Sequence, residues 1–153
     1  MRIVIGADHG GYILKSQLID FLNTLGHELK DVGAYNLDPS DDYPDFAQKV
    51  AECIAYGTSD RGIMLCGSGV GASVAANKVR GVRASVCHDI YSAHQGVEHD
   101  DMNVLCIGAR IIGKEAAFEL VSAFVDAKFS EENRHSRRLH KISLMEDRFN
   151  DSR

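Results

Sequence analysis

The chain has 153 residues, of which 44% are hydrophobic and 25% charged, with 14 Gly and only 2 Pro. This length and composition match one soluble globular domain over residues 1–153 and exclude the collagen-like and disordered classes. The formal net charge of -5 argues against nucleic-acid binding, because such binding needs a dense basic face.

The sequence predicts a cytoplasmic protein without a membrane segment. No apolar run approaches the roughly 20 residues of a membrane-spanning helix, and Asp8 comes too early for a signal-peptide core. The cysteines form no CxxC pair and lie in apolar stretches, so we interpret all of them as reduced thiols. They are Cys53, Cys66, Cys87 and Cys106.

Along the chain, short β-branched runs alternate with longer stretches of helical spacing. The predicted elements, in chain order, are a strand over 3–5, a helix with an apolar stripe over 13–25, a strand over 27–32, a polar loop over 34–43, a helix beginning at Pro44, a strand over 63–65, a glycine turn over 67–71, a helix over 72–79, strands over 82–87 and 103–107, and helices over 114–127 and 136–149. Strands joined by helices pair in parallel through right-handed crossovers. We therefore predict an α/β fold: a three-layer, doubly wound, Rossmann-like sandwich with a five-stranded parallel sheet and a C-terminal helix.

Ligands of such sheets bind outside the carboxyl ends of the strands. The residues that follow the predicted strands supply a carboxylate, imidazoles, a thiol and a guanidinium. They are Asp8 and His9 after the first strand, Cys66 and the glycine turn after the third, His88 and Asp89 after the fourth, and Arg110 after the fifth. The sequence thus predicts one site at this edge of the sheet.

The glycine turn is a candidate anion site. Gly67, Gly69 and Gly71 leave backbone N–H groups uncovered at the start of a helix, where an anion is stabilised. The same positive field favours the thiolate of Cys66, its nucleophilic or basic form. We interpret Cys66 as functional, and a buried structural cysteine beside a tight turn is the alternative.

A competing interpretation is dinucleotide binding. Gly67, Gly69 and Ala72 satisfy GxGxxA, and Asp89 lies about 20 residues further on. That fingerprint belongs after the first strand of the nucleotide fold, whereas here it follows the third. A thiol also has no role in holding pyrophosphate, so this match is weak.

The histidines predict no metal site, because no HExxH or Cys/His cluster is present and His94 and His99 are five residues apart. We expect His88 and His94 on a helix surface. His99, followed by Asp100 just before a strand, is a candidate for proton transfer.

A basic run begins at Arg134. Arg134 and Arg138 are one helical turn apart, and no acidic residue occurs over 134–141. Such a run is usually a solvated face, but it can also clamp a phosphorylated substrate. Arg110, at a strand end, is the stronger single candidate.

Taken together, several motifs resemble the type B ribose-5-phosphate isomerase family, which also includes galactose-6-phosphate and allose-6-phosphate isomerases. The resemblance covers nearly the whole chain. It rests on GADHGG at 6–11, DYPDFA at 42–47, GIMLCGSGVGASVAANKVRGVRA at 62–84, EHDDMNVLCIGARIIG at 98–113, and Arg134-His135 followed by Arg138.

The resemblance implies cofactor-free and metal-free aldose-ketose isomerisation of a sugar phosphate through a cis-enediolate. For the proton transfer, it implies that Cys66 is the base, that the N–H groups of 67–71 hold the enediolate oxygen and that Ser68 bonds the reacting oxygens. It implies that Asp8 and His99 help open the furanose ring. It also implies that Tyr43 lies near the sugar and that the phosphate is held by His9, Arg110, Arg134 and Arg138. It also implies a homodimer, or a tetramer, with shared sites, to which His99 comes from the neighbouring chain.

One departure concerns the sugar subsite. The family commonly has Asn where this chain has Asp100, and the carboxylate lacks the amide's donor near the sugar hydroxyls. Ribose 5-phosphate, with ribulose 5-phosphate as product in the pentose phosphate pathway, is the expected substrate. A hexose 6-phosphate, allose or galactose, is the alternative.

Overall fold

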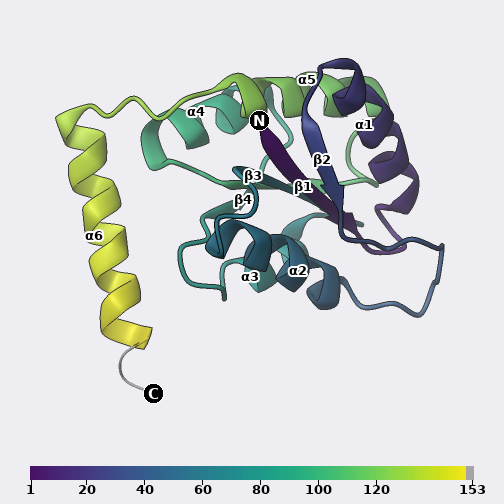
Figure 1. Ribbon diagram of the computed structural model, residues 1–153, viewed down its shortest axis with the longest axis horizontal. Helices are drawn as coiled ribbons and strands as arrows, with labels where there is room; N and C mark the ends of the chain where they lie inside the picture. The colour runs from purple at the N-terminus through teal and green to yellow at the C-terminus, as the bar shows by residue number, and fades with distance from the viewer. Residues whose placement is uncertain (151–153) are drawn as a thin grey trace.

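Five parallel strands form a sheet in the order β2-β1-β3-β5-β4 in the computed structural model, which describes residues 1–150 (Figure 1). The strands are β1 (Arg2–Ala7), β2 (Glu28–Asp31), β3 (Arg61–Cys66), β4 (Ala84–Val86) and β5 (Val104–Gly108). The helices are α1 (Tyr12–Thr24), α2 (Tyr43–Ala55), α3 (Val70–Ala76), α4 (Ile90–Asp100), α5 (Lys114–Asp126) and α6 (Asn133–Asn150).

The sheet is buried on both faces because alternate side chains of its strands point to opposite sides. On one face, Ile3 and Ile5 pack with the apolar residues of α1, α4 and α5. On the other face, Val4 and Met64 pack with α2 and α3. The predicted doubly wound, three-layer fold is therefore confirmed, and Figure 1 shows the two helical layers above and below the sheet.

The C-terminal helix α6 stands apart from these layers (Figure 1). It contacts the rest of the chain through α4, an Arg80–Asp147 ion pair and a hydrogen bond from the Gly81 N–H to Glu146. Its apolar side chains Ile142, Met145 and Phe149 are 45–69% exposed and line an open groove of about 1300 Å³ beside β4 and α4. The helix is present as predicted, but it begins at Asn133 instead of near 136.

Other element boundaries also differ from the prediction. Strand 82–87 is shortened to β4, because only Ala84 to Val86 pair with β5. The helix expected over 72–79 begins earlier, at Val70, directly after the left-handed Gly69. The helix-surface position expected for His88 is wrong, since His88 lies before α4 and its Nε2 accepts the Gly108 N–H at 2.8 Å.

No helix within residues 1–150 combines the length and the apolar character needed to cross a membrane.

Candidate active site

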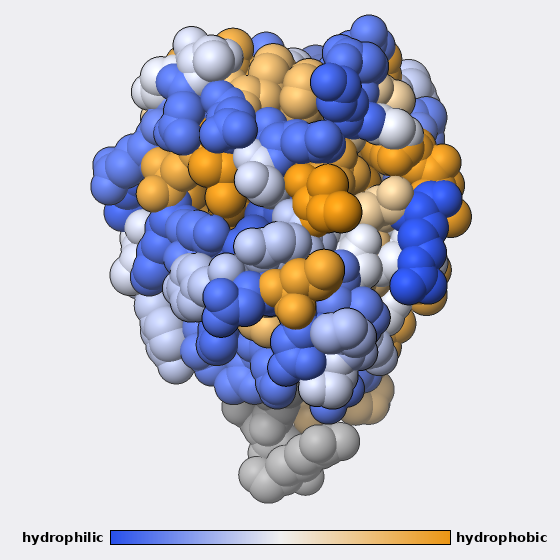
Figure 2. All heavy atoms as spheres, turned by 90° about the vertical axis from the view of Figure 1, so that its right-hand side faces the viewer, coloured by the Kyte–Doolittle hydropathy of each residue, from blue (hydrophilic) through white to orange (hydrophobic). Residues whose placement is uncertain are grey.

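Three loops meet at the carboxyl edge of the sheet, after β1, β3 and β5. The Asp8 N–H donates to the Leu65 carbonyl at 3.2 Å, and the Arg110 N–H donates to the Gly67 carbonyl at 3.1 Å. A Cβ added at Gly10 would lie 3.0 Å from the Gly67 nitrogen, so the β1 and β3 loops approach each other backbone to backbone. The strands run towards the right of Figure 1, the side facing the viewer in Figure 2, where hydrophilic residues surround separate hydrophobic patches.

Cys66 sits at the end of β3 with its thiol enclosed by the glycine turn. The side chain is buried, and its Sγ accepts the Gly69 N–H at 3.1 Å. Gly69 has φ of +82°, and an added Cβ would lie 3.1 Å from the backbone of Ile107, so glycine is required here. A backbone N–H aimed at sulfur stabilises a thiolate, which is the form that acts as a base.

Ser68 and Tyr43 complete the surroundings of the turn. Ser68 is exposed, and its Oγ accepts the Val70 N–H at 3.3 Å. The ring of Tyr43, at the start of α2, lies so close to Gly71 that an added Cβ there would be 2.6 Å from the ring. The turn therefore has an open side at Ser68 and a side closed by an aromatic ring.

Asp8 is a buried carboxylate beside this turn. Its Oδ1 accepts the N–H groups of Gly10 at 2.8 Å and of Gly11 at 3.1 Å. Burial raises the pKa of Asp8 above its usual value, and the two N–H groups oppose that rise. A carboxyl group with a raised pKa is suited to accept and return a proton.

His9 and Arg110 supply basic groups at the same edge. The guanidinium of Arg110 lies over Gly67, with Cζ 3.4 Å from the position of an added Cβ. His9 is paired with Asp41, whose Oδ1 lies 2.7 Å from His9 Nδ1. This hydrogen bond is the main cause that raises the pKa of His9, and nearby Arg110 opposes the rise. Asp41 was missed by the sequence analysis, because the loop over 34–43 has no periodicity that could single it out.

The remaining predicted site residues lie elsewhere: His99 and Asp100 at the end of α4, and Arg134 and Arg138 on α6. Because α4 connects the carboxyl end of β4 to the start of the parallel strand β5, its last turn lies at the amino edge of the sheet. One chain therefore does not bring His99 to Cys66. Nine other predicted residues do meet at the carboxyl edge: Asp8, His9, Tyr43, Cys66, Gly67, Ser68, Gly69, Gly71 and Arg110.

His99 is held by two neighbours. The amide Nε2 of Gln95 lies 2.7 Å from His99 Nδ1, and the ring of His135 stacks on the His99 ring with 4.0 Å between centroids. His135 is buried, and its pKa is lowered by burial first and by His99 second. Gln95 lies one turn before His99 on α4, whereas His135 reaches it from α6. Neither was predicted as a site residue, since no motif marks Gln95 and only the packing of the two helices brings His135 to His99.

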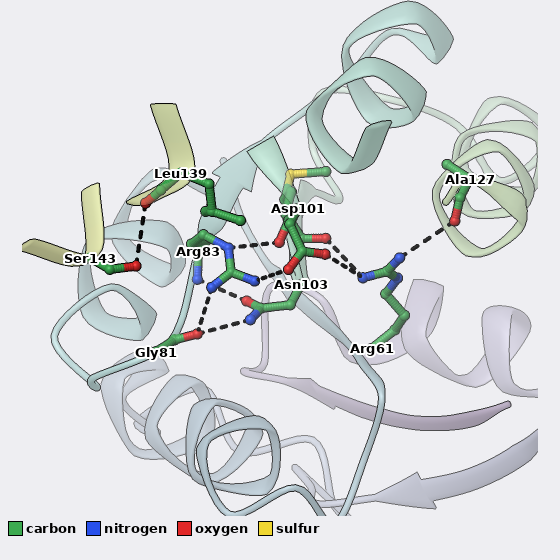
Figure 3. A network of polar contacts seen from close by, with 9 residues as sticks. Arg61, Gly81, Arg83, Asp101, Asn103, Ala127, Leu139 and Ser143 are labelled. Atoms are coloured by element: carbon green, nitrogen blue, oxygen red, sulfur yellow. Dashed lines mark hydrogen bonds and ion pairs between the residues drawn. The ribbon is translucent and has the colours of Figure 1, made fainter. Parts of the chain in front are cut away.

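A polar network fixes the end of α4 (Figure 3). Arg83 donates to the Asp101 carboxylate at 2.6 Å and to the Asp101 carbonyl at 2.7 Å. Asn103 accepts the Arg83 N–H at 2.8 Å, and Arg61 lies 4.0 Å from Asp101. The neighbours His99 and Asp100 therefore project from a firmly anchored helix end.

Within residues 1–150, one group of side chains is close enough to share a cation: Asp8, His9 and Asp41, with ligand atoms within 4.8 Å of one another. Two of these atoms already bond each other, and Asp8 Oδ1 accepts two backbone N–H groups. These contacts account for the group without an ion.

The residues of the dinucleotide fingerprint have other structural roles in this chain. Its glycines follow β3, and its acidic residue, Asp89, caps α4 by accepting the Ser92 N–H at 2.8 Å.

The family model described as Ribose/Galactose Isomerase matches residues 3–142. This chain belongs to that family of sugar-phosphate isomerases. Ribose-5-phosphate isomerase B of Escherichia coli K12 is 42% identical to it, over 97% of this chain and 99% of the relative.

Solved structures agree with this assignment. Ribose-5-phosphate isomerase B of Clostridium thermocellum has a TM-score of 0.94 at 46% identity, covering 97% of this chain and 99% of the other. The Mycoplasma genitalium enzyme with bound ribulose 5-phosphate has a TM-score of 0.91 at 38% identity, covering 95% of this chain and 96% of the other. The expected family is thus confirmed, and the enzyme class with it.

Proposed function

We propose that this isomerase interconverts ribose 5-phosphate and ribulose 5-phosphate, without a metal or cofactor, in the cytoplasm. The observation that carries the proposal is the Cys66 thiol, held against the Gly69 N–H at the edge where Asp8, His9 and Arg110 also lie. A base next to anion-binding N–H groups and cationic side chains suits proton transfer on a phosphorylated sugar.

The first step opens the furanose ring. Asp8 takes the proton of the O1 hydroxyl, the C1–O4 bond breaks towards O4, and O4 takes a proton from His99 while the C1 carbonyl forms. The burial that raises the pKa of Asp8 makes it a stronger base than a solvated carboxylate. Arg110 and His9 hold the phosphate, together with Arg134 and Arg138, and Tyr43 borders the sugar.

The second step moves the hydrogen. The Cys66 thiolate removes the proton from C2, and the C2–H electrons form the C1–C2 double bond while the negative charge moves to O1. Backbone N–H groups of the turn over 67–71 stabilise that oxyanion, and Ser68 bonds the reacting oxygens. The Cys66 thiol then returns the proton to C1, and the O2 proton passes to O1, which leaves the ketone at C2.

The complete site needs two chains. Because His99, Asp100, Arg134 and Arg138 lie on the amino-edge side of the chain that carries them, we propose that a homodimer, or a tetramer built from such dimers, supplies them to the neighbour's Cys66. The exposed apolar side of α6 supports association, since such a face is covered in stable assemblies.

A coupled isomerase assay on ribose 5-phosphate, allose 6-phosphate and galactose 6-phosphate, with chelator present, tests the proposal. We expect the highest kcat/KM for ribose 5-phosphate and no loss on chelation. A preference for a hexose phosphate would change the assigned substrate. If none of the three sugar phosphates is turned over, the proposal is refuted. Titration with NADH should give no saturable fluorescence change.

A further inference from the structure

Asp41 is joined to His9 twice through a single oxygen. Asp41 Oδ1 accepts the His9 backbone N–H at 3.0 Å and lies 2.7 Å from His9 Nδ1. The Asp41 side chain is only 10% exposed, whereas that of His9 is 31% exposed. The carboxylate is therefore enclosed, while the imidazole is partly exposed to solvent.

The chemistry of this pair decides where the imidazole proton sits. An ionised carboxylate only accepts hydrogen bonds, so His9 Nδ1 must carry the hydrogen. Neutral His9 then presents a bare Nε2, which accepts hydrogen bonds and does not bind a phosphate oxygen. Only the imidazolium donates from Nε2 while it keeps the bond to Asp41.

The charges around His9 come from three elements. Asp8 follows β1, Asp38 and Asp41 lie in the loop before α2, and Arg110 follows β5. The three carboxylates favour the imidazolium, and Arg110 disfavours it. The second oxygen of Asp41, Oδ2, is buried and has no hydrogen-bond partner among the described residues. His9 is therefore the main partner of the Asp41 charge.

We propose that Asp41 is a positioning residue that converts His9 into a cationic phosphate ligand by holding its Nδ1–H. The inference rests on the proposed function, which places the substrate phosphate at His9 and Arg110. The inference adds Asp41, which does not touch the substrate. Asp41 fixes the position of the proton on His9 and the orientation of its ring, and His9 is the residue that contacts the phosphate.

A pH dependence follows from this arrangement. The phosphate gains its second charge near pH 6, and His9 loses its proton as the pH rises through its raised pKa. Phosphate affinity should therefore rise through about pH 6 and fall again at higher pH. Asp41→Asn removes the carboxylate, so the His9 pKa drops and the falling limb moves to lower pH.

Ring-nitrogen NMR of the full-length protein tests the first step without any ligand. Wild-type His9, assigned by the loss of its signal in His9→Gln, should show a protonated Nδ1 and titrate above the usual histidine pKa. In Asp41→Asn it should titrate lower. A wild-type His9 that is protonated only on Nε2, or that titrates at the same pH in both proteins, would overturn the inference.

The second step is tested with inorganic phosphate as probe and with ribose 5-phosphate. At pH 7.5, Asp41→Asn should weaken phosphate binding and raise KM by about tenfold, the loss of one charge-assisted hydrogen bond, with kcat within about twofold. Calorimetry in buffers of different ionisation enthalpy should show more proton uptake on phosphate binding by Asp41→Asn than by the wild type, because wild-type His9 already carries the proton before phosphate binds. Asp41→Glu, which restores the charge, should recover part of the affinity and bring the uptake back towards the wild-type value.

A double-mutant cycle separates this role from a structural one. With His9→Gln already present, Asp41→Asn should change phosphate affinity less than about twofold, because its effect acts through His9. An undiminished further tenfold loss in that background contradicts the inference. Asp20→Asn removes an exposed carboxylate on α1 as the matched control and should change neither affinity nor uptake. If phosphate binds as described but no sugar phosphate turns over, the proposed function fails and this inference stands.

Discussion

The two edges of the sheet are built differently. At the carboxyl edge, backbone hydrogen bonds hold three loops together, and Cys66, Asp8 and Arg110 take their places from the ends of neighbouring strands. At the amino edge, His99 depends on side-chain contacts with Gln95 and His135, which come from two helices. The comparison teaches that one chain builds the proposed reacting centre at one edge and, on its opposite edge, the groups that we propose serve a second chain.

The largest effect is expected at the carboxyl edge. Cys66→Ala should reduce kcat by about a thousandfold or more, because it removes the proposed base for proton transfer, while substrate binding stays within about tenfold. Steady-state kinetics and binding of inorganic phosphate measure the two effects. Cys53→Ala, at a buried cysteine of α2, is the control and should keep kcat. Near wild-type turnover by the Cys66→Ala variant would refute the proposed mechanism.

The carboxyl edge could be predicted from sequence because one rule governs it: parallel strands end at the same edge, so Asp8, Cys66 and Arg110 had to meet. The contacts of Asp41 could not, since an irregular loop over 34–43 places it and no spacing predicts such a path. The stack of His135 on His99 joins two helices far apart in sequence, and only their packing sets it. The short β4 shows the same limit, because Val82 and Cys87 look like strand residues yet lie outside the pairing with β5.

The next effect tests the division between the edges directly. Cys66→Ala and His99→Ala chains, each inactive, should complement when they are mixed after dissociation. Half of the randomly paired dimers are mixed, and each mixed dimer has one intact site of two, so about a quarter of wild-type activity should return. Mass spectrometry verifies the exchange. A mixture that exchanges chains and stays inactive places His99 in its own chain's site or outside catalysis.

The proposed phosphate ligands should give a smaller effect, seen in KM. Arg110→Ala at one edge, and Arg134→Ala with Arg138→Ala at the other, should each raise KM by about tenfold or more with little change in kcat, because a phosphate remote from the reacting carbons is held alike in ground and transition states. Arg137→Ala, exposed on α6 between the two arginines, is the control. An unchanged KM in the double variant would show that the basic run is only a solvated face of α6.

The smallest effect is on stability, and the two edges should respond to pH with opposite sign. The pKa of buried Asp8 is raised, so the folded state binds more protons than the unfolded state above the usual Asp pKa of 3.8, and stability falls as pH rises through that window. The pKa of buried His135 is lowered, so the unfolded state binds more protons below the usual His pKa of 6.5, and stability falls as pH falls.

Two variants separate these responses in thermal unfolding. Asp8→Asn keeps an oxygen for the Gly10 and Gly11 N–H groups, so at pH 7 it should raise Tm by a few degrees while activity falls. His135→Phe keeps a ring against His99 and should lose less Tm than wild type between pH 7 and pH 5, whereas His140→Phe, exposed on the same helix, should follow wild type. Parallel Tm curves for His135→Phe and wild type would show that the buried imidazole takes no part in the acid response. The stack of His135 on His99 would then only position the His99 ring.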